Sequence, residues 1–327
     1  MKLRTEIIIE KSDTVIEHNQ PLITLGSCFA EHMGKKLKAN RFTVLDNPYG
    51  VLYNPASIYQ SLQLLKHSEF PQHELFFHDE EWHSFYHHSS FSHHIKNTCL
   101  KNINRQLKET QAFLIKTEHA IVTLGTAYVY RRRGSGQIVS NCHKMPADHF
   151  ERSLLDSEEI IRYLLGIIDL LRFFNPGMHI IFSVSPIRHL KDGLLGNQVS
   201  KTNLLFSIQK LASKAENWHY FPAYEIMLDD LRDYRFYEND LIHPNALAQE
   251  YIWRKFNASY FTDSCRETLN ALKDLNNARA HRPRNPRSPM FREFIKNQLY
   301  LIKELKQRYP YISFEQDIEY FETMLKE

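Results

Sequence analysis

The residues of this sequence best suited to chemistry are a serine near its start and an acid–base pair near its end. Ser27 lies in Thr24-Leu-Gly-Ser-Cys-Phe-Ala30, where an apolar stretch gives way to a segment of helical period. A serine placed there has its hydroxyl at the carboxyl edge of a strand, where the N–H groups of a helix start can stabilise an oxyanion. Gly26 permits the tight turn before it. Ser27 is therefore a candidate nucleophile.

Two other interpretations of this segment remain open. Serine is among the residues most favoured at a helix N-cap, so Ser27 could serve only to begin the helix. Cys28 is a rival nucleophile, but adjacent side chains at a helix start point in different directions, so only one of them can face a site. We expect Ser27 to face outward and Cys28 to pack against the sheet.

A serine hydroxyl is a poor nucleophile until a base takes its proton, so a histidine held by a carboxylate should accompany it. Among the 18 histidines, the best candidate is His243, which Pro244 and Asn245 follow. Pro244 can open a helix, which leaves His243 in the loop before it. Asp240, three residues earlier, can reach the imidazole Nδ1 and leave Nε2 free for the serine. Asp-x-x-His pairs also arise by chance in a chain this rich in histidine.

The elements that must position these residues follow an alternating pattern. Short apolar runs that end at Gly, Ser or Pro alternate with segments of helical period, which is typical of parallel β-α-β units. We expect five strands, at residues 22–25, 42–45, 120–124, 179–184 and 218–221. We expect helices from about residue 27, from 157 to 174, where Asp156 and Glu159 have capping-box spacing, and from about 201 to 215. The loops after the strands then line one edge of the sheet.

Two regions lie outside this alternation. Residues 66–98 form an insertion rich in histidine and aromatic residues, without enough periodicity to assign its elements. From residue 262 onward the pattern is helical, interrupted at 279–289 by a connector with three prolines that we expect to be extended and exposed. We therefore divide the chain into a main domain at 1–261 and a helical C-terminal extension at 262–327.

Composition excludes several classes of protein. The formal net charge of +3 is too small to imply a nucleic-acid partner. No apolar run approaches the roughly 20 residues of a membrane-spanning helix, and the first residues lack a signal-peptide core, so we expect a soluble cytoplasmic protein without membrane association. The four cysteines form no C-x-x-C pair. His73 and His78 are one residue too far apart for a zinc-binding H-E-x-x-H motif, and we expect no metal.

The two candidate segments together resemble the first and last signature blocks of the SGNH/GDSL hydrolase superfamily. More closely, Gly26-Ser-Cys-Phe-Ala30 resembles the motif for which the GSCFA family is named. Asn47-Pro-Tyr-Gly-Val-Leu-Tyr-Asn-Pro55 is similar to that family's next segment. The resemblance spans roughly residues 20–260. It implies an α/β fold, a flavodoxin-like three-layer α/β/α sandwich around a parallel sheet of about five strands, which agrees with the strands read from periodicity.

The resemblance also implies where an oxyanion would bind. The superfamily usually uses the N–H of the serine, a glycine after the second strand and an asparagine after the third. Gly50 follows the second predicted strand, but Gly125-Thr126-Ala127 replaces the usual asparagine after the third. Thr126 or Asn141 is the expected substitute, and His143 and Arg188 are further candidates for contact with substrate. Loss of one such donor can cost on the order of a hundredfold in rate.

We therefore expect an ester hydrolase in which Ser27 attacks the ester carbonyl, His243 moves the proton and Asp240 orients the imidazole. Water releases the acyl-enzyme, and no cofactor is needed. The resemblance implies small acyl esters, such as acetyl groups on carbohydrate, as substrates. Two alternatives stay open: an O-acyltransferase, and a non-catalytic carbohydrate- or protein-binding module, which the missing asparagine favours. The sequence does not indicate an oligomeric state.

Overall fold

A five-stranded parallel sheet forms the centre of the molecule. The computed structural model describes residues 5–281, 284–285 and 288–326. The strand order is β10-β9-β5-β1-β2, and every neighbouring pair is parallel. The strands are β1 (Leu22–Gly26), β2 (Val44–Asp46), β5 (His119–Leu124), β9 (His179–Val184) and β10 (Trp218–Phe221). The predicted α/β class and its parallel sheet are confirmed.

The strand order creates a switch point between β1 and β5. From β1 the chain first adds β2 on one side, and β5, β9 and β10 then follow on the other. Gly26 at the end of β1 pairs with Thr123 of β5, and Leu124 pairs with Val184 of β9, so these strands end at one edge. Helices that leave on opposite sides of a sheet open a crevice at such a point, and open α/β sheets bind ligands there.

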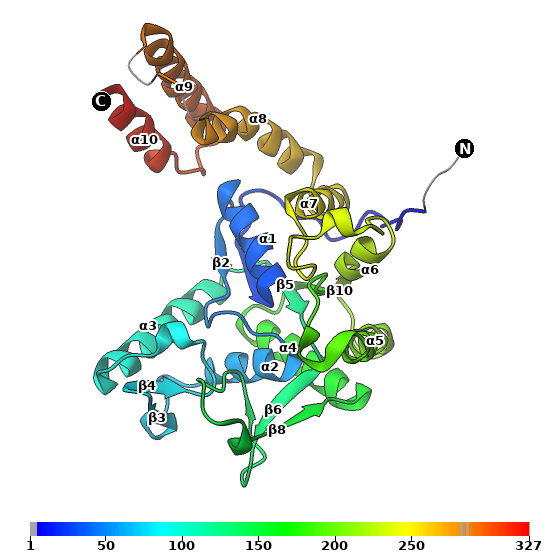
Figure 1. Cartoon of the computed structure of the whole chain (residues 1–327). Helices are drawn as coiled ribbons and strands as arrows, with labels where there is room; N and C mark the ends of the chain where they lie inside the picture. Colours follow the sequence, from blue (N-terminus) through cyan, green and yellow to red (C-terminus); the bar gives the residue numbers. More distant parts are fainter. Residues whose placement is uncertain (1–4, 282–283, 286–287, 327) are drawn as a thin grey trace.

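Helices cover both faces of the sheet, which confirms the three-layer arrangement (Figure 1). Alternate residues of β5 divide between two cores, because Val122 packs in one and Ile121 in the other. One layer contains α2 (Pro55–Leu64), α3 (Lys96–Leu114), α4 (Ser157–Phe174) and α5 (Gly193–Leu211). The other contains α1 (Cys28–Ala39), α6 (Ala223–Leu228) and α7 (Ala246–Tyr260).

The bounds of the predicted helices agree with the structure to different degrees. Helix α4 spans the predicted residues, and Asp156 and Glu159 form the expected capping box. Helix α5 begins at Gly193, eight residues before the predicted start, and ends at Leu211. Helix α7 begins at Ala246 and not at Pro244, because Asn245 is the N-cap residue, whose side chain accepts a hydrogen bond from the N–H of Ala248.

Several elements between the strands were not predicted. The histidine-rich insertion contains the hairpin of β3 (Leu75–His78) and β4 (Glu81–Ser84) and the start of α3. After β5 the chain forms a second sheet, with order β7-β6-β8. Its antiparallel strands are β6 (Tyr128–Arg132), β7 (Ile138–Val139) and β8 (Phe150–Leu154). Short 3₁₀ helices lie at Gln72–Glu74, Ser89–Phe91, Ala147–His149, Leu190–Asp192 and Tyr234–Phe236.

The C-terminal region is helical, as expected. It comprises α8 (Asp263–Ala280), α9 (Pro289–Arg308) and α10 (Glu315–Lys326), which extend beyond α7 in Figure 1. These helices share a hydrophobic core of their own, which includes Leu272, Ile295 and Phe321. Part of the predicted connector, residues 282–283 and 286–287, lies outside the described residues. Within the part of the chain that the structure describes, no helix combines the length and apolar character needed to cross a bilayer.

Candidate active site

Ser27 lies at the switch point, between β1 and α1. Gly26 makes the turn with φ of +128°, and a Cβ atom at this position would lie 2.1 Å from the carbonyl oxygen of Thr123. Only glycine fits this backbone, because both its conformation and the space around it exclude a side chain. The side-chain oxygen of Asn47 accepts a hydrogen bond from the N–H of Gly26 at 2.8 Å. The position of Ser27 is thus tightly determined.

The hydroxyl of Ser27 has no hydrogen-bond partner among the described residues. Ser27 is the N-cap residue of α1, but its side chain makes no capping hydrogen bond. The residue is 1% exposed. A buried hydroxyl without a partner is destabilising, and such exceptions often occur at functional sites. Ser27 is therefore a cap by position, and its hydroxyl remains free for another use.

The arrangement of Ser27 and Cys28 differs from the expected one. Cys28 is half-buried and lines a cavity, with its Sγ 3.6 Å from the hydroxyl of Tyr53. Ser27, by contrast, is almost fully covered. The expectation that Ser27 faces outward is wrong for this structure. Cys28 packs against the core on one face of the sheet, as expected, but it also lines the cavity. Cys28 remains a rival nucleophile.

Asp240 and His243 form a hydrogen-bonded pair. The Nδ1 atom of His243 lies 2.6 Å from Oδ2 of Asp240. The Oδ1 atom of the same carboxylate accepts the N–H groups of Ile242 and His243, at 2.9 and 3.0 Å. These hydrogen bonds to His243 and Ile242 lower the pKa of Asp240 to about 2. The carboxylate is therefore ionised at neutral pH and fixes Nδ1 as the protonated nitrogen, which leaves Nε2 as the basic one.

Arg188 holds the loop that carries this pair. Its N–H donates to the carbonyl oxygen of Ile242 at 3.3 Å, and Nη1 donates to that of Leu241 at 3.1 Å. The guanidinium group also lies 4.2 Å from the ring centre of Tyr237. Leu241 has a φ of +58°, a conformation that a branched side chain rarely adopts without such support. Arg188 lines the cavity and also positions the loop.

The two main-chain donors predicted for the oxyanion are already engaged. The N–H of Ser27 donates to the carbonyl oxygen of Thr123 at 3.0 Å. The N–H of Gly50 donates to that of Asn47 at 2.8 Å, closing a turn. Neither N–H is free in this structure, because both complete local backbone structure. An oxyanion would have to displace these bonds or find other donors.

Thr126 and Asn141, the proposed substitutes for the missing asparagine, both line the cavity. The hydroxyl of Thr126 lies 2.9 Å from that of Ser200 and accepts the N–H of Tyr128, so it is already engaged within the protein. Asn141 uses Oδ1 to accept the N–H of His143. Its amide nitrogen donates to none of the groups that the structure describes. Asn141 is thus the better placed of the two.

His143 does not lie where the prediction put it. Its ring is buried, and Nε2 bonds to the carbonyl oxygen of Ser84 at 2.8 Å. The residue is not part of the cavity wall, and its ring packs against that of His83 at an angle of 38°, with 4.4 Å between ring centres. Burial lowers its pKa to about 4. The expectation of a substrate contact is corrected: His143 stabilises the loop with a backbone hydrogen bond.

His189 lines the cavity beside Arg188, at the sheet edge where its place after the fourth predicted strand puts it. It follows β9, and Asn197 of α5 accepts its N–H at 2.9 Å. A Cβ atom placed on Gly125 would lie 3.0 Å from Nε2 of His189 and 3.2 Å from Cβ of Ser27. The imidazole of His189 and the side chain of Ser27 therefore both lie close to Gly125. Burial, with the nearby charge of Lys201, lowers the pKa of His189 to about 4, so the ring is neutral at physiological pH.

Lys201 is a fully buried lysine beneath this site. Its Nζ donates to the carbonyl oxygens of Gly125 and Ser185, each at 2.7 Å, and so joins the loops after β5 and β9. Burial lowers its pKa to about 7. The helical period of this segment does not show that the long side chain of Lys201 turns inward.

The cavity beside these residues has a volume of about 620 Å³. His243 and Cys28 lie in its wall, together with Tyr53 and His189. The opposite wall comes from the second sheet and its loops, and includes Tyr128, Tyr130, Phe150 and Arg152. This volume is typical of a pocket for a small ligand. Across the described residues, no group of three or more His, Cys, Asp or Glu side chains could hold a metal ion.

Comparison with known families shows to which family the chain belongs. A family model with the description "GSCFA family" matches residues 21–256. The chain belongs to the GSCFA family. A second model, described as the C-terminal domain of GSCFA domain proteins, matches residues 272–327. No curated protein matches.

Two solved structures are distantly similar to this chain. A carbohydrate esterase family 3 protein from Talaromyces cellulolyticus is 10% identical, with 78% of this chain and 99% of that chain covered and a TM-score of 0.33. An acetyl xylan esterase from the rumen bacterium Butyrivibrio proteoclasticus is 13% identical, with 80% and 65% covered and a TM-score of 0.32.

Proposed function

We propose that this GSCFA protein hydrolyses small acyl esters, with Ser27 as nucleophile and the Asp240–His243 pair as its base. The observation that carries the proposal is the 2.6 Å contact between Asp240 and Nδ1 of His243, in a wall of the cavity at the switch point where Ser27 lies. A carboxylate on one imidazole nitrogen and a serine without a partner are the parts that acyl transfer requires.

The reaction would proceed in two halves. Ser27 Oγ attacks the ester carbonyl carbon while Nε2 of His243 takes the hydroxyl proton, and the same proton is then given to the departing alcohol. Water, deprotonated by Nε2, next attacks the acyl-enzyme, which releases the carboxylic acid and returns the proton to Oγ. The Ser27 hydroxyl has no hydrogen bond in this structure, so the exposed loop of Asp240 must move toward it. Such contacts commonly tighten only when substrate binds.

We assign the oxyanion to donors other than the two amides already engaged. Nε2 of the neutral His189 and Cβ of Ser27 both lie close to Gly125. A neutral imidazole there can donate a hydrogen bond to a developing negative charge. Asn141 supplies a free side-chain amide from the facing loop. In this proposal these two side chains do the work that a third-strand asparagine does elsewhere in the superfamily.

The cavity wall supports a carbohydrate ester as substrate. Tyr128 and Tyr130 present aromatic rings, and the guanidinium group of Arg152 lies 4.9 and 4.8 Å from their ring centres. Aromatic rings with nearby polar groups suit a hydroxyl-rich ring, and a volume of about 620 Å³ holds a small acylated sugar. An acetyl ester on carbohydrate is therefore the proposed substrate class.

A non-catalytic binding module is the second candidate. This alternative is supported by the burial of Ser27, which is 1% exposed, and by the engagement of the N–H groups of Ser27 and Gly50 in backbone hydrogen bonds.

An O-acyltransferase would use the same acyl-enzyme with an alcohol in place of water. Release of acetate, compared with transfer to an added sugar, separates hydrolase from transferase.

The test is hydrolysis of p-nitrophenyl acetate and of an acetylated sugar by the purified chain. His243→Ala should abolish turnover, while His281→Ala, a change at a histidine outside the cavity, should leave it intact. Binding of the sugar without any turnover would favour the module instead.

A further inference from the structure

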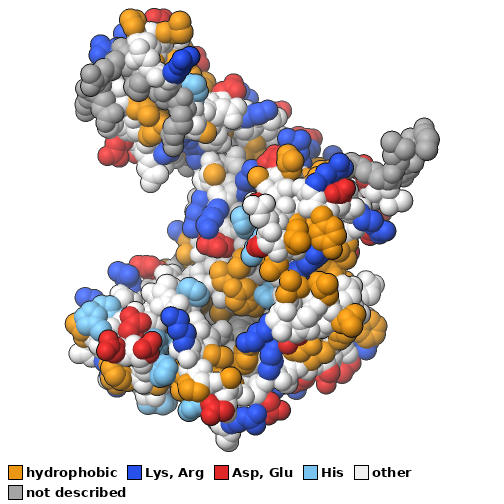
Figure 2. All heavy atoms as spheres, viewed as in Figure 1, with side chains coloured by type: hydrophobic (Ala, Val, Ile, Leu, Met, Phe, Trp, Pro, Cys, Tyr) orange, Lys and Arg blue, Asp and Glu red, His pale blue; other side chains and the backbone are white. Residues whose placement is uncertain are grey.

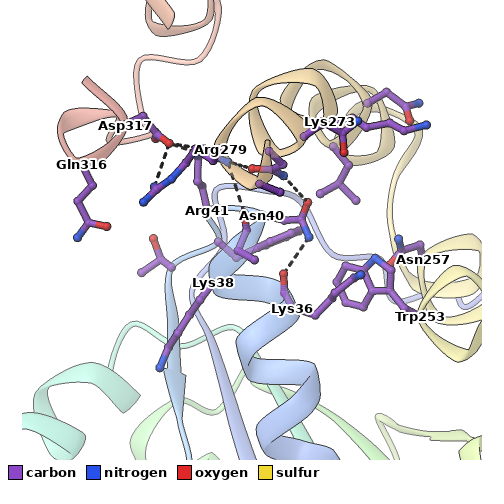
Figure 3. A pocket seen from close by; sticks show the side chains of 18 of the residues that line it. Lys36, Lys38, Asn40, Arg41, Trp253, Asn257, Lys273, Arg279, Gln316 and Asp317 are labelled. Carbon is purple, nitrogen blue, oxygen red and sulfur yellow. Dashed lines mark hydrogen bonds and ion pairs between the residues drawn. The ribbon is translucent and has the colours of Figure 1, made fainter. Parts of the chain in front are cut away.

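A second, larger cleft lies at the opposite end of α1, between the main domain and the C-terminal helices. Its volume is about 1220 Å³, more than the usual pocket of about 300–1,000 Å³ for a small molecule. Its walls come from the end of α1, from α7 and α8, and from the start of α10 with the segment before it. Figure 3 shows side chains of residues in these walls. Because α1 has 12 residues, this cleft lies roughly 18 Å along the helix from Ser27. It is therefore separate from the candidate active site.

The lining of this cleft is strongly basic. Six Lys or Arg residues line it against two acidic ones, Glu250 and Asp317. The whole chain has a formal net charge of only +3, so the excess of positive charge is concentrated here. The basic residues are Lys36, Lys38, Arg41, Arg254, Lys273 and Arg279. Figure 2 shows the hollow between the two parts, with Lys and Arg side chains on the main domain beside it.

Asp317 organises one side of the cleft. It is 2% exposed and accepts hydrogen bonds from Arg41, at 2.7 and 3.2 Å, and from Arg279 at 3.1 Å. Figure 3 shows both arginines converging on this carboxylate. Arg41 is also bonded to Asn276, so its donors are used within the protein. One carboxylate thus neutralises one of two guanidinium groups, and Arg279 retains donors that can face a ligand.

Positive charge also exceeds negative charge in the other walls of the cleft. Glu250 contacts Nζ of Lys36 at 2.6 Å and Nε of Arg254 at 3.1 Å, so one carboxylate again serves two cations. Lys273, on α8, is exposed and forms no ion pair with the described residues. Lys38 is an exception, because it extends away from the cleft to Asp46 at 3.6 Å. Unneutralised positive charge therefore approaches the cleft from α8 and from the side formed by α1 and α7.

We propose that this basic cleft binds a small oligoanion, a ligand with several phosphate or carboxylate groups. Charge-assisted hydrogen bonds from Arg and Lys are the strongest that such groups receive, and arginine can bind them through two N–H groups at once. Asn270, Asn277 and Gln316 also line the cleft and can bond to hydroxyl groups between the charges. Both a phosphate chain and a carboxylated oligosaccharide have this chemistry. The ligand would bridge the main domain and the C-terminal helices.

The experiment is calorimetric titration of the full chain with tripolyphosphate, trigalacturonate and neutral maltotriose. At least one of the two anions should bind, more weakly as salt is raised, and maltotriose should not. Tighter binding of trigalacturonate would identify a carboxylated carbohydrate as the source of the charge, and tighter binding of tripolyphosphate a phosphate compound.

Variants then locate the site. The double variant Lys273→Gln with Arg254→Gln leaves Asp317 and its partners intact, so the fold should be preserved, and it should weaken binding by about tenfold or more. The control double variant Lys296→Gln with Lys303→Gln also removes two positive charges, at exposed positions of α9 outside the cleft, and should alter Kd less than twofold. The proposal is overturned if neither anion binds, if maltotriose binds as tightly, or if the control double variant weakens binding as much as the first one does.

Discussion

Asp240 holds His243 at two points, because one carboxylate oxygen accepts the main-chain N–H of His243 at 3.0 Å and the other contacts Nδ1 of its ring at 2.6 Å. The three-residue spacing makes this possible within one turn of chain. A single carboxylate thus fixes both the backbone and the imidazole, and the remaining nitrogen, Nε2, is left for proton transfer. This arrangement is the strongest structural support for acid–base chemistry in the chain.

Asp240→Asn should therefore lower kcat on the order of a thousandfold, because an amide can neither fix the Nδ1–H tautomer nor stabilise the imidazolium. Asp233→Asn is a matched control, since the side chain of Asp233 also accepts a main-chain N–H two residues later, that of Arg235, but contacts no histidine. Steady-state kinetics on an acetyl ester measure both. Equal activity of Asp240→Asn and the parent chain would show that the pair is only structural.

His189→Leu should lower kcat by about a hundredfold with little change in KM, because a donor to the oxyanion acts mainly in the transition state. His189→Gln retains a donor and should recover part of the loss. His73→Leu, at an exposed histidine on a 3₁₀ helix, is the control. If His189→Leu raises KM and leaves kcat unchanged, His189 binds substrate and does not stabilise the oxyanion.

Gly26→Ala should destabilise the fold by about 3 kcal/mol or more, because the new Cβ meets the carbonyl oxygen of Thr123 in a conformation that already disfavours a side chain. Gly134 also has a positive φ, of +85°, but nothing lies within 4 Å of its added Cβ. Gly134→Ala should cost only about 1–2 kcal/mol. Urea unfolding measures the difference, and similar losses in the two variants would refute the steric argument.

The free energy of unfolding should fall as pH is lowered from about 6.5 to 4. Burial lowers the pKa of His87 to about 3 and of His119, His143 and His189 to about 4, from an ordinary value of 6.5. Below pH 6.5 the unfolded chain takes up protons that the folded chain does not, so unfolding becomes easier, and this contribution is fully present only above that pH. Urea unfolding across this range should show a shallower slope for His143→Gln. An unchanged slope would mean that His143 titrates normally.

Much of the fold could be predicted from the sequence, because buried parallel strands and amphipathic helices have strong periodic signals. The strands β9 and β10 and the helix α4 have the predicted bounds. Helix α3 was missed although its buried residues Cys99, Ile103 and Leu107 recur every fourth position, so the signal was present. The second sheet is different, since β7 has two residues and depends on contacts with β6 that no local pattern encodes.

The candidate site was predictable in part. Asp240 and His243 lie within one loop, so their spacing sufficed to predict a contact. The turn that engages the N–H of Gly50 was also readable, since Pro48 and Gly50 occupy favoured turn positions. The sequence did not show that Ser27 is buried while Cys28 is partly exposed, because this depends on how α1 packs against the sheet. It also did not show that His189 lies close to Gly125, because these residues are in loops that follow two strands far apart in the sequence.

The most direct test of the account is to treat the chain with a fluorophosphonate probe and identify the labelled residue by peptide mass spectrometry. The account predicts a phosphonylated Ser27, with labelling abolished in Ser27→Ala and His243→Ala and retained in Cys28→Ala. Labelling that persists in Ser27→Ala, or loss of activity confined to Cys28→Ala, would contradict it and assign the chemistry to the thiol in the cavity wall.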